Sequence, residues 1–126
     1  DIRFEGWVRP FVPKNCRFMI CNGGLLAYGA LLGADGACMW LGNIAPKLCN
    51  DIISAGLVGE FKRARDLQET ASMLDYRIGR FGVAGVKAAL SELGYTMSGP
   101  RAPIGDISKA DRANIKEALF DAEILV

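Results

Sequence analysis

The sequence predicts an α/β fold in which one parallel strand–helix–strand unit is followed by helices alone. Two short apolar runs, residues 17–21 and 36–40, flank a Leu- and Ala-rich segment at 25–32 that stops at Gly33. Strand, helix and strand in so short a span are typical of a right-handed parallel crossover. No strand pattern follows residue 45, and 126 residues with 51% hydrophobic content suffice for a single core.

The first elements follow from local pattern. In residues 1–15, apolar side chains recur at helical spacing, but Pro10 and Pro13 interrupt the pattern. We therefore expect a short helix that leads into a loop. The runs at 17–21 and 36–40 lack polar alternation, which favours strands buried on both faces.

Four helices are predicted in the rest of the chain, over residues 45–56, 59–78, 83–93 and 106–119. Pro46 suits the first turn of the first helix, and glycines follow the ends of the first and third. The second helix carries one apolar stripe, formed by Phe61, Ala64, Leu67, Ala71 and Leu74. Asp106 or Ser108 is expected to cap the last helix.

Composition and charge exclude several classes of function. Fifteen Lys and Arg stand against 14 Asp and Glu without charge blocks, so we expect neither a nucleic-acid interface nor a polybasic membrane surface. Since the chain contains no histidine, it cannot supply an imidazole base or a His-ligated metal site, and we expect no metal and no cofactor. The sequence shows neither a membrane-spanning apolar stretch nor a signal-peptide pattern at its start.

The four cysteines are Cys16, Cys21, Cys38 and Cys49. They form neither a C-x-x-C pair nor the short-spaced framework of a disulfide-stapled domain, so we expect a cytoplasmic location and small, buried, unreactive thiols. Cys21 and Cys38 also lie at the carboxyl ends of the two predicted strands. That edge is where ligands bind in parallel sheets and barrels.

Five further residues lie at the same edge and have two interpretations each. Asn22, Gly23 and Gly24 could present backbone N–H groups to an anion, but a tight turn with positive φ is the preferred interpretation. Trp40 and Asn43 close the second strand. An indole is commonly a core residue and an asparagine a turn or cap residue, yet their location raises the case for binding.

Four segments resemble one enzyme family. FMICNGGLL at 18–26 and LLGADGACMWLGNIAP at 31–46 are similar to the last two barrel strands of the dihydrodipicolinate synthase and N-acetylneuraminate lyase family. GVKAAL at 85–90 and GPRAP at 99–103 are similar to its C-terminal helical extension. Family members are TIM barrels with added helices that make or break carbon–carbon bonds through a Schiff base between pyruvate and a barrel lysine.

The resemblance implies that residues 1–45 are the C-terminal βα units of a TIM (β/α)8 barrel and that residues 46–126 are its last helix and helical extension. The family's Schiff-base lysine and catalytic tyrosine belong to earlier strands, so no catalytic residue is expected in this chain. A full barrel needs about 250 residues. We therefore expect the chain to be the C-terminal piece of a longer polypeptide that supplies the N-terminal half of the barrel.

By the same resemblance, the expected substrate-binding residues are Cys21, Gly23, Gly24, Cys38, Trp40 and Asn43. Cys21 and Cys38 would form the wall beside bound pyruvate. Sialic-acid lyases of the family carry an acidic pair at the positions of Gly23 and Gly24 and a small hydroxyl residue at that of Trp40. An indole without those carboxylates favours a flat, conjugated substrate.

This pattern is similar to the branch of trans-o-hydroxybenzylidenepyruvate hydratase-aldolase, which cleaves aryl-substituted unsaturated pyruvates to an aromatic aldehyde and pyruvate. Trp40 and Asn43 would then shape the aldehyde pocket of a homotetrameric lyase. Two alternatives remain. One is a generic dihydrodipicolinate synthase or keto-deoxy-sugar aldolase or dehydratase, in which Trp40 only fills space. The other is a non-catalytic helical oligomerisation fragment.

Overall fold

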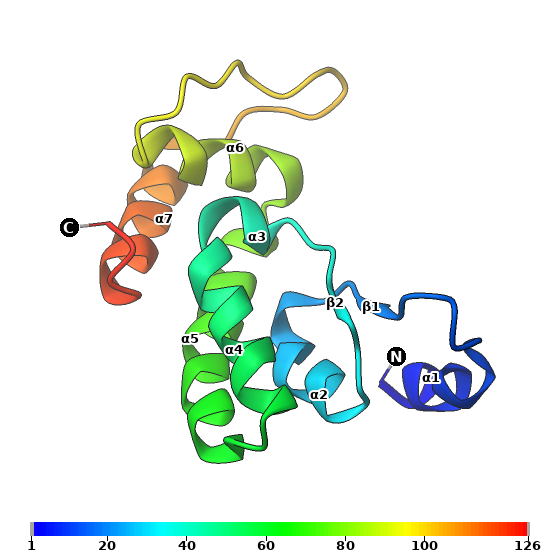
Figure 1. Cartoon of the computed structure of the whole chain (residues 1–126). Coiled ribbons are helices and arrows are strands. Elements are labelled where there is room, and N and C mark those ends of the chain that lie inside the picture. Colours follow the sequence, from blue (N-terminus) through cyan, green and yellow to red (C-terminus); the bar gives the residue numbers. More distant parts are fainter. Residues whose placement is uncertain (1, 126) are drawn as a thin grey trace.

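Helices dominate the computed structural model, which describes residues 2–125 (Figure 1). In chain order the elements are α1 (Ile2–Val8), η1 (Arg9–Phe11), β1 (Met19–Ile20), η2 (Gly23–Leu25), α2 (Leu26–Leu31), β2 (Gly36–Ala37), α3 (Leu41–Ile44), α4 (Pro46–Leu57), α5 (Phe61–Gly79), α6 (Gly82–Glu92) and α7 (Lys109–Asp121), where η marks a 3-10 turn. The short N-terminal helix and the four helices expected after residue 45 are confirmed. No helix within residues 2–125 is both long and apolar enough to span a membrane.

The two strands pair in parallel across α2, which confirms the predicted crossover. Met19 lies opposite Gly36 and Ile20 opposite Ala37. The prediction of strands buried on both faces is wrong: Ile20 is only 1% exposed, but Met19 is 43% exposed. Within residues 2–125 no third strand joins this two-stranded sheet, so the outer edge of each strand has no neighbouring strand.

The second strand ends earlier than predicted because a helical turn follows it. β2 stops at Ala37, and Trp40, the N-cap residue of α3, already has helical backbone angles. Leu41 and Ile44 of α3 are buried in the core, and the Ala45 N–H donates to the Leu41 carbonyl at 2.8 Å. Burial of two side chains one turn apart therefore stabilises a helix where the sequence pattern favoured a strand and a turn.

The core lies where α4 and α5 run side by side and pack against α2 (Figure 1). Its largest fully buried side chains are Ile20, Leu26, Leu41, Ile52, Leu74, Ile78, Ile115 and Leu119. α2 and α4 approach so closely that a Cβ on Gly56 would stand 2.5 Å from the Cβ of Ala30. Gly56 is therefore a packing residue as well as part of a helix end.

The apolar stripe predicted for α5 is confirmed in part. Ala64, Ala71 and Leu74 are buried, but Phe61 is 59% exposed. Phe61 begins α5 just after the chain reverses at Gly59, which has a φ of +84°. At this reversal α4 has already ended, and no neighbouring helix covers the Phe61 ring.

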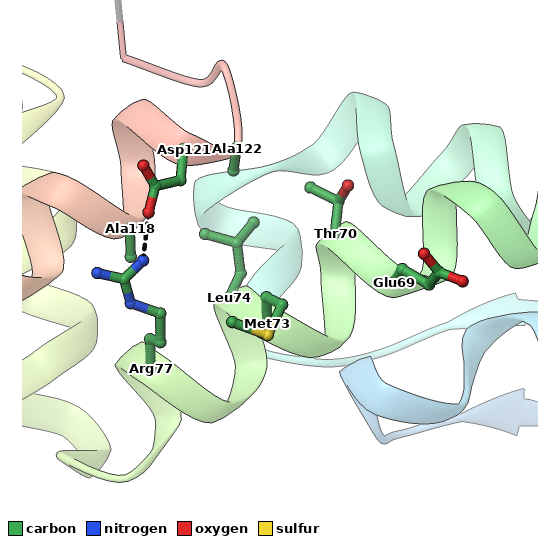
Figure 2. Close-up of a pocket in the computed structure, with 8 residues that line it drawn as sticks. All are labelled: Glu69, Thr70, Met73, Leu74, Arg77, Ala118, Asp121 and Ala122. Atoms are coloured by element: carbon green, nitrogen blue, oxygen red, sulfur yellow. Dashed lines mark hydrogen bonds and ion pairs between the residues drawn. The ribbon is translucent and has the colours of Figure 1, made fainter.

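α6 and α7 pack at the far end of the bundle from α1 (Figure 1). Ser108 is the cap of α7, since its Oγ accepts a hydrogen bond from the Asp111 N–H at 3.1 Å. Arg77 of α5 attaches α7 through Glu117, at 2.8 Å, and through Asp121 (Figure 2). The Arg77–Asp121 pair borders a pocket of about 240 Å³ between the two helices.

Candidate functional site

The candidate site begins at the carboxyl ends of β1 and β2. Cys21 and Cys38 follow the last paired residues of the two strands, and the Cys38 N–H donates to the Ile20 carbonyl at 2.9 Å. The parallel register therefore brings both cysteines to one edge, as expected. Both thiols are exposed, and so is that of Cys16, so the prediction of buried thiols is right only for Cys49. Burial raises the pKa of the Cys49 thiol.

Residues 22–24 form a capped turn beside these cysteines. The Asn22 Oδ1 accepts the Gly24 N–H at 2.8 Å and so occupies a donor that an anion would need. The turn interpretation is confirmed, but its reason differs, because neither Gly23 nor Gly24 has a positive φ. A Cβ on Gly23 would stand 2.8 Å from Asp75 Oδ1 and 3.1 Å from Leu41 Cδ2. Glycine at position 23 therefore allows the turn to approach Asp75 and Leu41 closely.

Two polar side chains of α5 face this turn, and neither was predicted. Gln68 donates from Nε2 to the Gly23 carbonyl and accepts the Ala27 N–H at Oε1, both at 2.9 Å. The Asp75 carboxylate lies against Gly23, and partial burial raises the pKa of this carboxyl. The sequence does contain a signal for Gln68, since it interrupts a buried apolar stripe one helical turn from Ala64.

Trp40 and Asn43 lie in a separate groove between α3 and α6. The groove has a volume of about 520 Å³, and its apolar side chains include Val83, Val86 and Leu90. The Trp40 indole also lies against the end of α5. The groove lining does not include the four predicted residues at the strand edge, so the structure divides the six expected binding residues into two groups.

Asn43 holds a turn in this structure. Its side-chain amide donates to the Trp40 carbonyl at 3.2 Å, and its backbone N–H donates to the same carbonyl at 3.0 Å. Asn43 is exposed and lines the groove beside the indole. It is therefore placed both to stabilise α3 and to contact a ligand in the groove.

The charges nearest the strands serve the fold. Asp35 precedes β2 and accepts hydrogen bonds from the Phe18 N–H and from Arg17, both at 2.9 Å, which lower the pKa of its carboxyl. Residues 2–125 contain no cluster of three or more Cys, Asp or Glu side chains arranged to hold a metal ion. Within this part of the chain, the candidate site is built of backbone groups, thiols, the amides of Gln68 and Asn43, one carboxylate and one indole.

Comparison with known proteins relates the chain to one enzyme family. The family model of the dihydrodipicolinate synthetase family matches residues 14–122. The chain is 32% identical over 97 residues to 4-hydroxy-tetrahydrodipicolinate synthase from Methylobacterium radiotolerans, covering 75% of this chain and 32% of that protein. It is also 32% identical over 109 residues to an uncharacterized DapA-like lyase from Halobacterium salinarum, covering 86% and 36%. The chain thus spans about a third of the length of these curated relatives.

Solved structures show the same fold. Dihydrodipicolinate synthase from Bacteroides thetaiotaomicron matches with a TM-score of 0.75 and 26% identity, covering 83% of this chain and 37% of that one. The chloride-inhibited enzyme from Acinetobacter baumannii, complexed with pyruvate, matches with a TM-score of 0.88 and 24% identity, covering 99% and 43%. N-acetylneuraminate lyase from Fusobacterium nucleatum gives 0.85 and 23%, covering 100% and 43%. The architecture therefore corresponds to part of a TIM barrel.

Proposed function

Because this chain belongs to the dihydrodipicolinate synthetase family, we propose that it forms one wall of the active site of a lysine-imine pyruvate lyase. The observation that carries the proposal is the parallel β1–β2 pair with the exposed segments after its carboxyl edge. In TIM barrels this edge faces the active site. The imine-forming lysine and the remaining strands would belong to the N-terminal half of the barrel.

In this proposal the residues after β1 and β2 bind and orient pyruvate. Lysine and the pyruvate carbonyl condense to an imine with loss of water, and the protonated imine accepts the electron pair released when the carbon–carbon bond breaks. Cys21 and Cys38 would contact the pyruvate part, and the Gly23–Gly24 backbone would set the depth of the pocket. None of these groups needs to transfer a proton.

We further propose a planar aryl substrate of the hydratase-aldolase type, supported by the groove beside Trp40. Its volume falls within the range of about 300–1,000 Å³ that is usual for small-molecule sites. The indole and the aliphatic side chains of Val83, Val86 and Leu90 suit an aromatic ring, and stacking adds to simple area burial. Water would add across the conjugated double bond before the bond to the aldehyde carbon breaks.

A second candidate function is supported by the names of the relatives. The relatives that are 32% identical over the aligned residues include 4-hydroxy-tetrahydrodipicolinate synthases, and similar structures include a 2-keto-3-deoxygluconate aldolase from Sulfolobus solfataricus. In such an enzyme the part of the substrate beyond pyruvate would be aliphatic, as in a small aldehyde or in the chain of a keto-deoxy sugar acid. Trp40 would then be a packing residue without substrate contact.

The assembly is proposed to be a homotetramer, supported by apolar side chains exposed on α5 and α7. Met73 and Tyr76 are more than half exposed and Phe120 nearly so. Burial of such side chains between copies is a common source of stability in symmetric oligomers. Sedimentation velocity of the whole protein tests it, and a monomer at micromolar concentration would contradict it.

One experiment tests the function. The whole polypeptide that carries these residues is incubated with pyruvate and borohydride, and its intact mass is measured. We expect one reduced pyruvate adduct per chain, and absence of an adduct would contradict the lyase proposal. Turnover is then compared for trans-o-hydroxybenzylidenepyruvate, for aspartate semialdehyde with pyruvate, and for 2-keto-3-deoxygluconate. Preference for either of the last two would favour the second candidate.

A further inference from the structure

The side chain of Gln68 bridges the two ends of a broken helical turn. The Gly23 carbonyl and the Ala27 N–H are four residues apart, the spacing of an α-helical hydrogen bond. Each of these groups instead bonds to the Gln68 amide, at 2.9 Å. Gln68 thus completes the junction between η2, which ends at Leu25, and α2, which begins at Leu26.

This insertion has a physical cause and a geometric consequence. The Ala27 N–H belongs to the first turn of α2 and has no partner within that helix, and leaving such a donor unpaired away from water is costly. An amide supplies one donor and one acceptor at a set separation. A side chain inserted into the helical ladder also changes the direction of the chain there.

The glycine turn and the Gln68 amide have further close neighbours. Gly23 is buried between Asp75 of α5 and Leu41 of α3, and a Cβ added to it would stand 2.8 Å and 3.1 Å from their side chains. The second hydrogen of Gln68 Nε2 is directed at Ser72 Oγ, 3.2 Å away on the next turn of α5. With both amide ends engaged, Gln68 has little freedom to adopt another rotamer.

We propose that Gln68 is a positioning residue for substrate: through its amide, α5 sets the location of the Gly23–Gly24 turn that faces pyruvate. This inference rests on the proposed function, since it assumes that the turn contacts substrate. Gln68 does not itself touch the reacting atoms. Misplacement of a binding group by about 1 Å is enough to change rates by up to roughly 100-fold.

The decisive variant is Gln68→Glu in the whole polypeptide. A carboxylate can accept the Ala27 N–H but repels the Gly23 carbonyl, whereas a protonated carboxyl group can again donate and accept. We expect the KM for pyruvate to rise about tenfold or more at neutral pH. The ratio of variant to wild-type KM should fall toward one as the pH is lowered through the titration of the new carboxyl group.

Two further variants separate positioning from stability. Gln68→Met is close in size but lacks both hydrogen bonds, so it should raise the KM at every pH without recovery in acid. Ser72→Ala removes only the third contact of the amide and is the matched control, with a KM like that of the wild type. Hydrogen exchange at the Ala27 N–H should speed up roughly two- to tenfold in Gln68→Met.

The outcomes distinguish this inference from the proposed function. A wild-type pyruvate adduct together with an unchanged KM in both Gln68 variants would overturn the positioning role alone. Loss of kcat and thermal stability at unchanged KM would show a structural role only and would also overturn it. Failure of the wild type to form any pyruvate adduct would overturn the proposed function, and the positioning role with it.

Discussion

The indole of Trp40 lies directly on Gly79, at the last residue of α5. A Cβ on Gly79 would stand 3.0 Å from Trp40 Cζ2, closer than ordinary van der Waals contact. Because Gly79 has no side chain, the indole can lie against this end of α5, and its position there shapes the groove beside α6.

Replacing Gly79 with Ala tests this contact. Overpacking costs about 1–3 kcal/mol, whereas Ala in place of Gly gains at most about 1 kcal/mol, and that only inside a helix, while Gly79 is the last residue of α5. We expect the free energy of unfolding to fall, measured by urea titration, together with a shift in tryptophan fluorescence. Gly42→Ala is the control, since nothing lies within 4 Å of its added Cβ. Equal stability of the two variants would show that the indole moves freely.

Replacing Trp40 with Ser tests the aryl-binding proposal. If the indole stacks on the substrate, turnover of an aryl-substituted pyruvate should fall by roughly tenfold or more, because stacking and apolar burial are both lost. Pyruvate imine formation, followed by borohydride trapping, should change little. Trp7→Ser, which alters an exposed indole of α1, is the control. Equal losses in both assays of Trp40→Ser would remove Trp40 from substrate selection.

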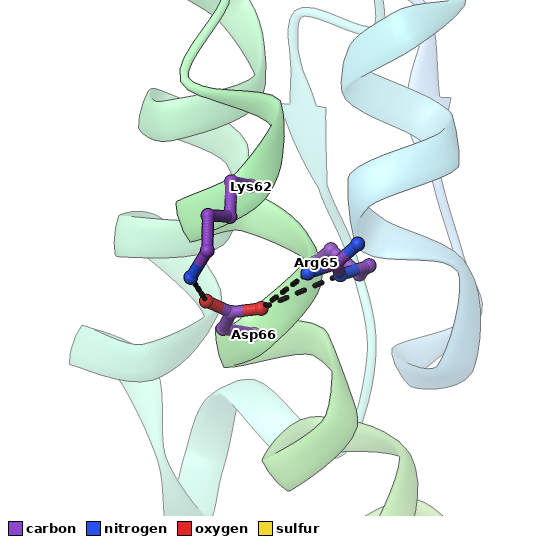
Figure 3. Close-up of polar contacts among 3 residues, drawn as sticks. All are labelled: Lys62, Arg65 and Asp66. Carbon is purple, nitrogen blue, oxygen red and sulfur yellow. Dashed lines mark hydrogen bonds and ion pairs between the residues drawn. The ribbon is translucent and has the colours of Figure 1, made fainter.

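Arg77 is expected to be the main polar link between α5 and α7. Its side chain is 21% exposed and pairs with both Glu117 and Asp121. Hydrogen bonds to charged groups contribute about 1.5–3 kcal/mol, and exposure of the two carboxylates reduces this, so Arg77→Ala should lower the free energy of unfolding by about 1–2 kcal/mol. Arg65→Ala is the control: Arg65 pairs with Asp66 on the exposed face of α5 (Figure 3), where loss costs about 0–1 kcal/mol. A smaller effect at Arg77 than at Arg65 would refute the prediction.

Asp75 should make stability depend on pH. Burial raises the pKa of its carboxyl above the ordinary value of 3.8, so the folded state binds the proton more tightly than the unfolded chain does. The contribution of Asp75 to the free energy of unfolding therefore becomes unfavourable as the pH rises above 3.8. Asp75→Asn should be more stable than the wild type at neutral pH, with the difference vanishing in acid, as urea titrations from pH 3 to 8 would show.

Asp66 provides a control of opposite sign. Hydrogen bonds from Lys62 and then from Arg65 lower the pKa of its carboxyl (Figure 3). Its favourable contribution is present above 3.8 and is lost as the pH falls through the lowered pKa. Asp66→Asn should therefore be slightly less stable than the wild type at neutral pH only. The same pH dependence for both variants would contradict the burial argument for Asp75.

Local pattern predicted much of the fold. Proline at the start of α4, serine at the start of α7 and the parallel crossover could all be read from neighbouring residues, because caps, helical periodicity and short connections depend on nearby chain. The resemblance of 18–26 and 31–46 to one family was also present in the sequence and is confirmed by the family model. The family to which the chain belongs was thus determined by the sequence alone.

Only the tertiary structure decided how that site is built. Gln68 and Asp75 meet the turn at Gly23 from more than 40 residues away in the chain, and no local pattern specifies which helix face will meet which turn. The same holds for Trp40, whose place is set by the bare surface of Gly79. Secondary structure follows from hydrogen bonds and periodicity within a segment, whereas these contacts follow from close packing between segments, which depends on the shapes of all of them together.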